Sequence, residues 1–286
     1  MNEVLVVDIG GTKTNVSLLD KNDENEEIKI LNTEIFKTNK NPELQIQKIK
    51  EIGFSKNFNP KANKLSLSLP GKWDKEGVLK ESYFLHEWLN YPFVKKTSDE
   101  LGIKECIFET DVICGGLGEY HFGVGALRAT PLLYLNLGTG IGAALINNGK
   151  PYKVDSKPVL RMQKLVLPFQ DELYSAVDLI SGGSLQHTSG YESIETLFSD
   201  YKKGEVNAVD ILMRAQVQLS AWIINLFYLF GPDVIVLNGG LTYDWDVLAE
   251  GAVDLAQEEL GDEVQILPSK LKELAPVYGA YVNFKC

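Results

Sequence analysis

The residues with the clearest capacity for chemistry follow the apolar run at positions 4–7 and read Asp8-Ile9-Gly10-Gly11-Thr12-Lys13-Thr14. Two glycines allow a tight turn whose N–H groups approach an anion, while the threonine hydroxyls and the lysine ammonium add donors. A carboxylate such as Asp8 suits this place if a divalent cation lies between it and phosphates. The segment therefore predicts a phosphate loop after a buried strand. A plain Gly-Gly hairpin with a return strand at 16–19 is the alternative, and the two are compatible.

A second stretch repeats this design. The apolar run at 132–137 is followed by Gly138-Thr139-Gly140-Ile141-Gly142, a second apolar run at 143–146, and an Asn-Gly turn. This order predicts strand, glycine turn and strand again. Two such units far apart in the sequence suggest a duplicated fold that contributes one phosphate loop from each half.

Two other glycine sites end predicted strands. The strand at 233–237 is followed by Asn238-Gly239-Gly240, where the absence of side chains lets a flat nucleoside lie against the backbone. The alternating strand at 64–69 ends at Pro70-Gly71, which is first of all a turn. Gly71 would also let a polyol approach the backbone, and the sequence leaves both interpretations open.

Thr110-Asp111 stands between a predicted strand at 105–109 and a helical segment at 112–120. An aspartate at such a junction is commonly the N-cap of the helix. It can also be a general base, because ligand crevices in α/β sheets open at the carboxyl ends of strands. The two roles compete only in part.

The remaining elements fit an α/β protein. Helices are predicted at 42–52, opened by Asn41, and within 204–230, at 247–260 and at 277–284, with a further strand at 28–36. The segment 150–168 contains three prolines and shows no period, which predicts irregular structure. A chain of 286 residues is long enough for two domains.

Composition excludes several classes of partner. The net charge of −11 disfavours binding to nucleic acid or to an anionic membrane. The longest apolar stretch, 219–230, is interrupted by Ser220 and Asn225 and is too short to span a bilayer. Three scattered cysteines offer no disulfide framework and fit a reducing cytosol, and a strand beginning near Met1 leaves no signal peptide. We therefore expect a cytoplasmic protein.

These motifs, in this order, resemble those of the ROK (repressor, open reading frame, kinase) family of glucokinases and related sugar kinases. The resemblance covers nearly the whole chain, with a gap at about 151–177. It implies an actin-like/Hsp70-like ATPase (ribonuclease H-like) fold with two α/β domains around a cleft. We expect a small domain at 1–110 and a large domain at 111–286, with the final helix packing back on the small one. The residues that carry the resemblance are Asp8 to Thr14, Pro70-Gly71, Trp88, Thr110-Asp111, Gly118-Glu119, Phe122-Gly123, Gly138 to Gly142, Pro232 to Gly240 and Gly279-Ala280.

The resemblance also implies an ATP-dependent kinase acting on a hexose or hexose-like hydroxyl, with ATP and Mg²⁺ as cofactors. Asp111 would be the general base, and Asp8 would lie by the metal, contacting it through water or phosphate. Gly71, Thr110 and Asp111 would line the sugar pocket. The ATP-binding residues would be Gly10, Gly11, Thr12 and Lys13, then Gly138, Thr139 and Gly140, with Gly239 and Gly240 beside the adenosine.

Departures from the family pattern concentrate in the sugar pocket. Thr110 replaces the usual asparagine before the base, and 150–168 contains neither the glutamate nor the histidine of a usual Gly-Glu-x-Gly-His segment. Asp178 lies one residue away from the position of a further sugar-binding glutamate. The cysteine-rich zinc segment is missing, so we expect no structural zinc, and His121 and His187 match no ligand. These losses weaken an assignment to glucose more than an assignment to ATP.

Three functions remain after this comparison. The first is a kinase with an altered sugar pocket, and the second is a non-catalytic nucleotide- or sugar-binding sensor that keeps the fold. The third, a repressor, is disfavoured because the first loop begins near Met1 and the chain is acidic. Retention of Asp8 and Asp111 favours the kinase. A homodimer is an expectation that comes from the family alone.

Overall fold

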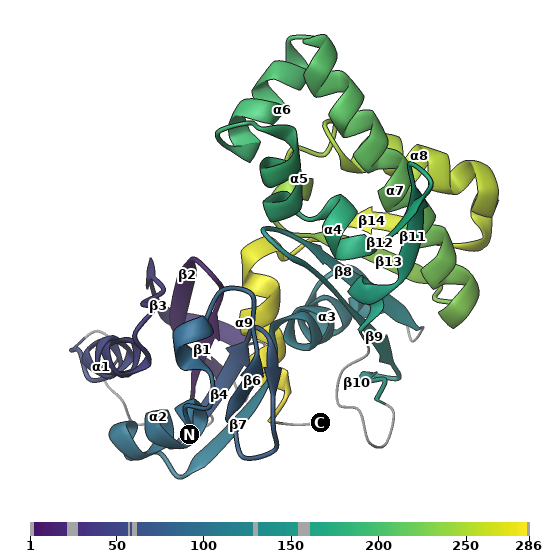
Figure 1. Ribbon diagram of the computed structural model, residues 1–286. Coiled ribbons are helices and arrows are strands. Elements are labelled where there is room, and N and C mark those ends of the chain that lie inside the picture. The colour runs from purple at the N-terminus through teal and green to yellow at the C-terminus, as the bar shows by residue number, and fades with distance from the viewer. Residues whose placement is uncertain are drawn as a thin grey trace. The chain divides into compact units, whose positions relative to one another are not determined.

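Two five-stranded mixed sheets, with helices packed against them, make up the protein (Figure 1). The structure is a computed structural model that describes residues 3–21, 28–56, 58, 62–127, 131–153 and 161–284. The chain divides into two units, one formed by Met1–Gly118 with Glu273–Cys286 and the other by Glu119–Lys272. The predicted α/β fold class is confirmed.

The first sheet has the strand order β3-β2-β1-β4-β7. Strands β1 and β2 pair antiparallel around the first glycine loop, and β3 continues the antiparallel edge. Strands β4 and β7 join β1 in parallel. The strands are β1 (Val4–Ile9), β2 (Lys13–Lys21), β3 (Ile28–Lys37), β4 (Lys64–Leu69) and β7 (Glu105–Thr110).

Side chains of β1 alternate between two apolar layers of the first unit. Leu5, Val7 and Ile9 pack in the layer that contains residues of α1 (Pro42–Gly53) and α2 (Phe93–Leu101). Val4 and Val6 pack against α9 (Ala275–Val282), which Figure 1 shows in yellow beside the N-terminal sheet. The period of two therefore places Asp8 on the face shared with α9.

The second sheet repeats the first, with strand order β10-β9-β8-β13-β14. Strands β8 and β9 pair antiparallel around the second glycine loop, β10 continues the antiparallel edge, and β13 and β14 are parallel to β8. The two glycine loops thus occupy equivalent places in equivalent sheets, as a duplicated fold requires. The strands are β8 (Leu132–Leu137), β9 (Ile141–Asn147), β10 (Lys150–Pro151), β13 (Val234–Asn238) and β14 (Gln265–Pro268).

Helices of the second unit cover one face of its sheet. Leu133, Leu135 and Leu137 of β8 belong to the same core as Leu219 and Trp222, which are fully buried on the 25-residue helix α7. The remaining helices are α3 (Asp111–Phe122), which spans the boundary of the units, α4 (Ala176–Ile180), α5 (Gly182–Ser189), α6 (Ile194–Lys202), α7 (Val206–Phe230) and α8 (Ala249–Leu260). No helix in the described part of the chain is long and apolar enough to cross a membrane.

The helix predicted at 42–52 is confirmed together with its start, where the Asn41 side chain accepts hydrogen bonds from the N–H groups of Glu43 and Leu44. The prediction of irregular structure over 150–168 is wrong in part. Besides β10, this segment contains β11 (Val166–Phe169), which pairs with β12 (Glu172–Ser175). Pro168 is tolerated there because β11 is one strand of an isolated two-stranded hairpin. Residues 154–160 lie outside the described residues. A second hairpin, β5 (Lys72–Trp73) with β6 (Leu79–Glu81), follows β4.

Candidate functional site

Asp8 lies near the carboxyl end of β1, directly across from Ser68 on β4. The Ser68 hydroxyl donates a hydrogen bond of 2.5 Å to Oδ1 of Asp8. Desolvation by the surrounding protein raises the pKa of Asp8 to about 6, and the bond from Ser68 opposes that shift. Asp8 as a residue keeps partial exposure to solvent.

Asp111 is the first residue of α3 and directly follows β7. Because β1, β4 and β7 are parallel, Asp111 and Asp8 both lie at the carboxyl edge of the sheet. The Val112 N–H donates to Oδ1 of Asp111 at 2.9 Å, so the carboxylate also caps the start of its own helix. Desolvation, and after it the charge of Asp8, raise the pKa of Asp111 to about 7. A carboxylate with such a pKa is suited to accept a proton near neutral pH.

The two carboxylates fit a divalent cation that arrives with a ligand. Within the described residues neither Asp8 nor Asp111 has a cationic partner. Burial raises the pKa of both carboxyl groups, so ionisation of each is less favourable than in water. No group of three or more His, Cys, Asp or Glu in the described part of the chain is arranged to hold a metal ion. Mg²⁺ needs fewer protein ligands than that when it is shared with phosphates and water.

The first glycine loop joins β1 to β2. The Gly10 N–H donates to the Lys13 carbonyl at 2.8 Å, which closes the turn. The N–H groups of Gly11 and Thr12 have no acceptor among the described residues, and the Lys13 side chain is exposed. These donors could meet an anion, whereas the Thr14 hydroxyl, expected to help, is fully buried and bonded inside the protein.

The second glycine loop is held from behind by the start of α5. The N–H of Gly182 donates to the Gly138 carbonyl at 2.9 Å, and the N–H of Gly183 donates to the Thr139 carbonyl at 2.8 Å. A Cβ on Gly183 would lie 2.9 Å from the Thr139 carbonyl oxygen, so this approach needs glycine. With its carbonyls engaged, the loop leaves the N–H groups of Thr139 and Gly140 without acceptors in the part of the chain that is described.

The Gly239-Gly240 junction adjoins this second loop. Gly239 has φ +98°, and a Cβ there would lie 2.4 Å from the carbonyl oxygen of Leu137, the residue before Gly138. A Cβ on Gly240 would meet nothing within 4 Å. Gly240 lines a cavity of about 480 Å³ whose other walls come from α6, from Lys203 directly after it and from Asp244. That volume suits a small organic ligand.

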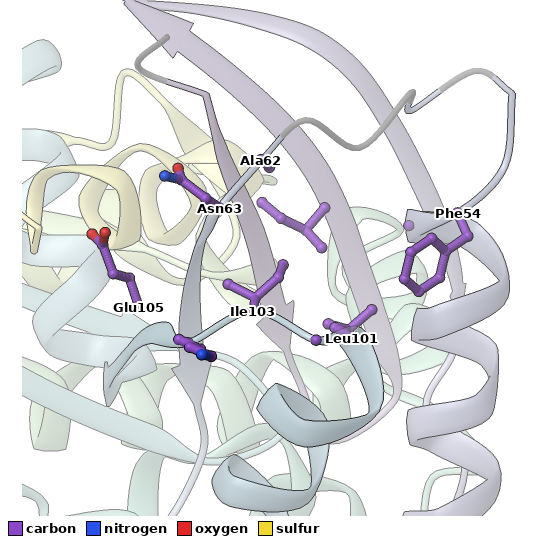
Figure 2. Close-up of a pocket in the computed structure, with 10 residues that line it drawn as sticks. Phe54, Ala62, Asn63, Leu101, Ile103 and Glu105 are labelled. Atoms are coloured by element: carbon purple, nitrogen blue, oxygen red, sulfur yellow. The ribbon is translucent and has the colours of Figure 1, made fainter.

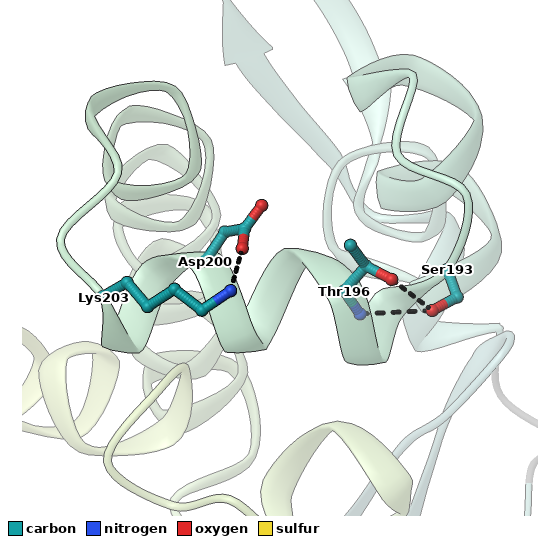
Figure 3. Close-up of polar contacts among 4 residues, drawn as sticks. All are labelled: Ser193, Thr196, Asp200 and Lys203. Carbon is teal, nitrogen blue, oxygen red and sulfur yellow. Dashed lines mark hydrogen bonds and ion pairs between the residues drawn. The ribbon is translucent and has the colours of Figure 1, made fainter.

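Helix α6, which lines this cavity, has polar contacts at both of its ends, and Figure 3 shows them. The Ser193 hydroxyl accepts a hydrogen bond from the Thr196 N–H at 3.1 Å and so caps the helix. In the last turn, Lys203 forms an ion pair of 2.8 Å with Asp200. Lys202 pairs with Asp244 at 3.1 Å across the cavity's lining. The pocket wall is therefore held by local bonds before any ligand binds.

Gly71 and Thr110 carry less evidence for contact with a sugar. Gly71 has φ +93°, and a Cβ there would lie 2.5 Å from the Glu81 carbonyl oxygen, so the turn between β4 and β5 explains this glycine by itself. Thr110 is 8% exposed, and its buried hydroxyl has no hydrogen-bond partner within the described part of the chain. Asp178 is exposed on α4, where its carboxylate accepts a hydrogen bond from Ser175.

Another pocket in the first unit lies at the wrong end of the sheet for this chemistry. Figure 2 shows its lining, which includes Phe54, Leu101, Ile103 and Glu105. Ile103 precedes β7 and Glu105 begins it, whereas Asp111 follows the opposite end of that strand. The pocket is therefore separate from the two carboxylates.

The predicted site residues are divided between the two units. The first unit contains Asp8, Asp111 and the loop at 10–13, and the second contains the loops at 138–140 and 239–240. Sequence reasoning missed Ser68 and the pair Gly182 and Gly183. A serine one strand away from Asp8 and the sequence Ser-Gly-Gly were the only signals for them. Both act by orienting a predicted group.

Comparison with known proteins now identifies the family. The profile described as "ROK family" matches residues 4–154. An uncharacterized protein of Clostridium perfringens is 29% identical, over 98% of this chain and 97% of that protein. A beta-glucoside kinase of Listeria monocytogenes is 24% identical, over 77% of this chain and 78% of its own length.

Solved structures show the same fold. The ROK hexokinase of Thermus thermophilus has a TM-score of 0.80 at 21% identity, covering 99% of each chain. The ROK glucokinase of Streptomyces griseus, solved with glucose and AMPPNP, has a TM-score of 0.76 at 21% identity and covers 98% of each chain. The sequence match spans more than half of this chain and the structural matches span nearly all of it, so the chain belongs to the ROK family.

Proposed function

We propose that this ROK-family sugar kinase transfers the γ-phosphoryl group of ATP to a hydroxyl of a hexose or hexose-like sugar, with Asp111 as general base. The observation that carries the proposal is the place of Asp111. It is a partly exposed residue at the carboxyl edge of the first sheet, with the pKa of its carboxyl raised to about 7 beside a second carboxylate. A residue that only capped a helix would not need a buried environment beside a second carboxylate.

The proposed role of Asp111 is to accept the proton of the attacking sugar hydroxyl. A positioned base of this kind contributes about 10²–10⁴-fold to the rate. Asp8 would hold Mg²⁺ through water or phosphate, and the ion neutralises charge on the phosphate oxygens when it is bound. Lys13 and the N–H groups of Gly11 and Thr12 would bind phosphate oxygens, which matters because phosphoryl transfer depends mainly on positioning and charge.

We assign the other end of ATP to groups of the second unit. The N–H groups of Thr139 and Gly140 are further phosphate donors, and the cavity beside Gly240 has the volume for the adenosine. The nucleotide analogue in the Streptomyces griseus glucokinase supports the choice of ATP. We also propose that Gly71 and Thr110 lie beside the sugar, because both follow or end strands at the carboxyl edge of the first sheet. Both would contact the sugar through their backbone and not through a side chain.

The test is an assay of ADP release with ATP, Mg²⁺ and a panel of sugars. We expect turnover stimulated by at least one sugar. We expect Asp111→Asn to abolish that turnover while MgATP binding, measured by calorimetry, stays within about twofold of the wild type. MgATP binding without turnover on any sugar would favour a non-catalytic sensor. Unchanged turnover in Asp111→Asn would remove the base assignment.

A further inference from the structure

A chain of buried hydrogen bonds runs from helix α1 to the first glycine loop. Nε2 of Gln45 donates to Oγ1 of Thr14 at 2.7 Å, and the hydroxyl oxygens of Thr14 and Thr38 are 2.9 Å apart. The Thr38 hydroxyl donates to the Gly10 carbonyl at 2.9 Å. Gln45 and Thr14 are fully buried and Thr38 is 7% exposed, so water cannot replace these bonds.

The direction of every bond in this chain follows from its neighbours. Oε1 of Gln45 accepts from the Asn39 N–H at 2.8 Å, which fixes the amide so that its nitrogen faces Thr14. Thr38 uses its only hydroxyl proton on Gly10, so Thr14 must donate its own proton to Thr38. The donors therefore run in one order, from Gln45 through Thr14 and Thr38 to the Gly10 carbonyl.

The end of the chain bears on the groups assigned to phosphate. The Gly10 carbonyl and the Gly11 N–H belong to one peptide unit, and a hydrogen bond accepted by the carbonyl makes the N–H of the same unit a stronger donor. Thr38 also donates through its own N–H to the Thr12 carbonyl at 3.0 Å. Both carbonyls are thereby turned away from an anion that would approach the free N–H groups of Gly11 and Thr12.

The second loop shows the same arrangement with different donors. There the N–H groups of Gly182 and Gly183 engage the carbonyls of Gly138 and Thr139. In both loops, carbonyls are engaged from behind while neighbouring N–H groups have no acceptor among the described residues. This shared arrangement points to a role in ligand binding rather than in chain stability alone.

We infer that Gln45 is a positioning residue for ATP, acting through Thr14 and Thr38 on the Gly10–Gly11 peptide. The inference rests on the proposed function, because it takes the first loop to be a phosphate site. Gln45 touches no substrate. It orders the side chains of Thr14 and Thr38, which orient the loop.

The variant Gln45→Met keeps the length of the side chain and removes both its donor and its acceptor. We expect the KM for ATP to rise about tenfold, as for one lost hydrogen bond in a charged site, while the KM for the sugar stays within about twofold. Thr38→Val, which cuts the last link, should have the same effect. The double variant should be no worse than Thr38→Val alone, because both changes break one chain.

The matched control is Asn41→Ala on the same helix. It removes the two cap hydrogen bonds of α1 and lowers the melting temperature, but it leaves Gln45, Thr14 and Thr38 in place. We expect its KM for ATP to stay within about twofold of the wild type. A second readout needs no nucleotide: in the free protein, the amide proton resonance of Gly11 should move to lower frequency in Gln45→Met and not in Asn41→Ala.

The outcomes separate this inference from the proposed function. A wild type that binds MgATP, with a Gln45→Met variant that binds it equally well and shows an unmoved Gly11 resonance, would overturn the positioning role alone. A wild type that binds no MgATP by calorimetry would overturn the proposed function, and the role of Gln45 with it. A raised KM for ATP in Asn41→Ala equal to that in Gln45→Met would assign the effect to stability of α1 and would also overturn the inference.

Discussion

Ser68 donates a hydrogen bond of 2.5 Å to Asp8 from the neighbouring strand, and it is fully buried. Desolvation raises the pKa of Asp8 and this bond lowers it, and the two effects together leave the pKa at about 6. Only the ionised carboxylate attracts a cation, so the bond from Ser68 favours the state of Asp8 that the proposed Mg²⁺ site needs near neutral pH. The role proposed for Asp8 therefore depends on a residue that itself has no charge.

The first prediction concerns Ser68→Ala. Loss of the hydrogen bond raises the pKa of Asp8, so a smaller fraction of the protein has the ionised carboxylate. We expect the Mg²⁺ concentration for half-maximal activity to rise about three- to tenfold at pH 6 and less at pH 8, where Asp8 is ionised in both proteins. A Mg²⁺ titration of the kinase rate at the two pH values measures this.

Ser66→Ala is the control for that experiment. Ser66 is also buried on β4, but its hydroxyl donates to the Ala280 carbonyl of α9 at 2.6 Å. Its loss should lower stability without changing the Mg²⁺ requirement. If the two variants needed the same Mg²⁺ concentration at pH 6, the link between Ser68 and the cation would be wrong.

The second prediction concerns the pH dependence of catalysis. Below its pKa of about 7, Asp111 is protonated and cannot accept the proton of a sugar hydroxyl. We expect kcat/KM for MgATP, which reports the ionisation of the free enzyme, to fall about tenfold per pH unit between pH 7 and 6. Below pH 6 it should fall more steeply, because Asp8 then takes up a proton as well. A steady-state profile from pH 5.5 to 8.5 checks this. A profile that stayed flat down to pH 5.5 would exclude a base with this pKa.

The third prediction concerns the stability of Asp111→Asn. The pKa of Asp111 rises from 3.8 to about 7 on folding, so between these values the folded state holds a proton that the unfolded state releases. Wild-type stability therefore falls as the pH rises through this window, and asparagine has no such charge. At pH 8 we expect the variant to be more stable by about 1–3 kcal/mol, a range reduced for the partial exposure of the site.

Urea unfolding at several pH values tests this third prediction. The advantage of Asp111→Asn should shrink as the pH falls from 7 toward 3.8, and it should vanish below 3.8, where the folded and the unfolded wild type both carry the proton. A variant that is inactive but more stable is expected when the native group supports activity and lowers the free energy of unfolding. A variant less stable than the wild type at pH 8 would mean that the charge of Asp111 stabilises the fold.

The strands, the glycine loops and the two central acids could be predicted from the sequence because each depends on neighbours in the chain. Apolar runs that end in glycine place β1 and β8, and the residue after β7 places Asp111. The partners of these groups could not be predicted. Ser66 and Ser68 are equivalent in the alternating sequence of β4. Only the pairing with β1 and the packing of α9 determine that Ser68 bonds to Asp8 while Ser66 bonds to Ala280.

Thr110 shows the same limit from the other side. The family resemblance implies that Thr110 lines the sugar pocket. In the structure its side chain is buried, and its oxygen has no hydrogen-bond partner among the described residues. The direction of a side chain at a strand end depends on which elements pack over it. The pattern of a single sequence does not reveal that packing. The place of Thr110 at the end of β7 follows from the chain itself, whereas the burial of its side chain follows from packing.

The last prediction uses Gly239 and Gly240 as a matched pair. A Cβ on Gly239 would lie 2.4 Å from the Leu137 carbonyl oxygen at a φ of +98°, whereas a Cβ on Gly240 would meet nothing within 4 Å. Gly239→Ala should therefore lower the free energy of unfolding, by about 1–3 kcal/mol or more, through backbone strain and the collision.

Gly240→Ala should leave stability within about 0.5 kcal/mol but intrude on the cavity assigned to the adenosine. We expect its KM for ATP to rise at least about threefold with the KM for the sugar unchanged. Equal ATP affinity in Gly240→Ala and the wild type would place the nucleoside elsewhere, because the added methyl group has no other neighbour through which to act.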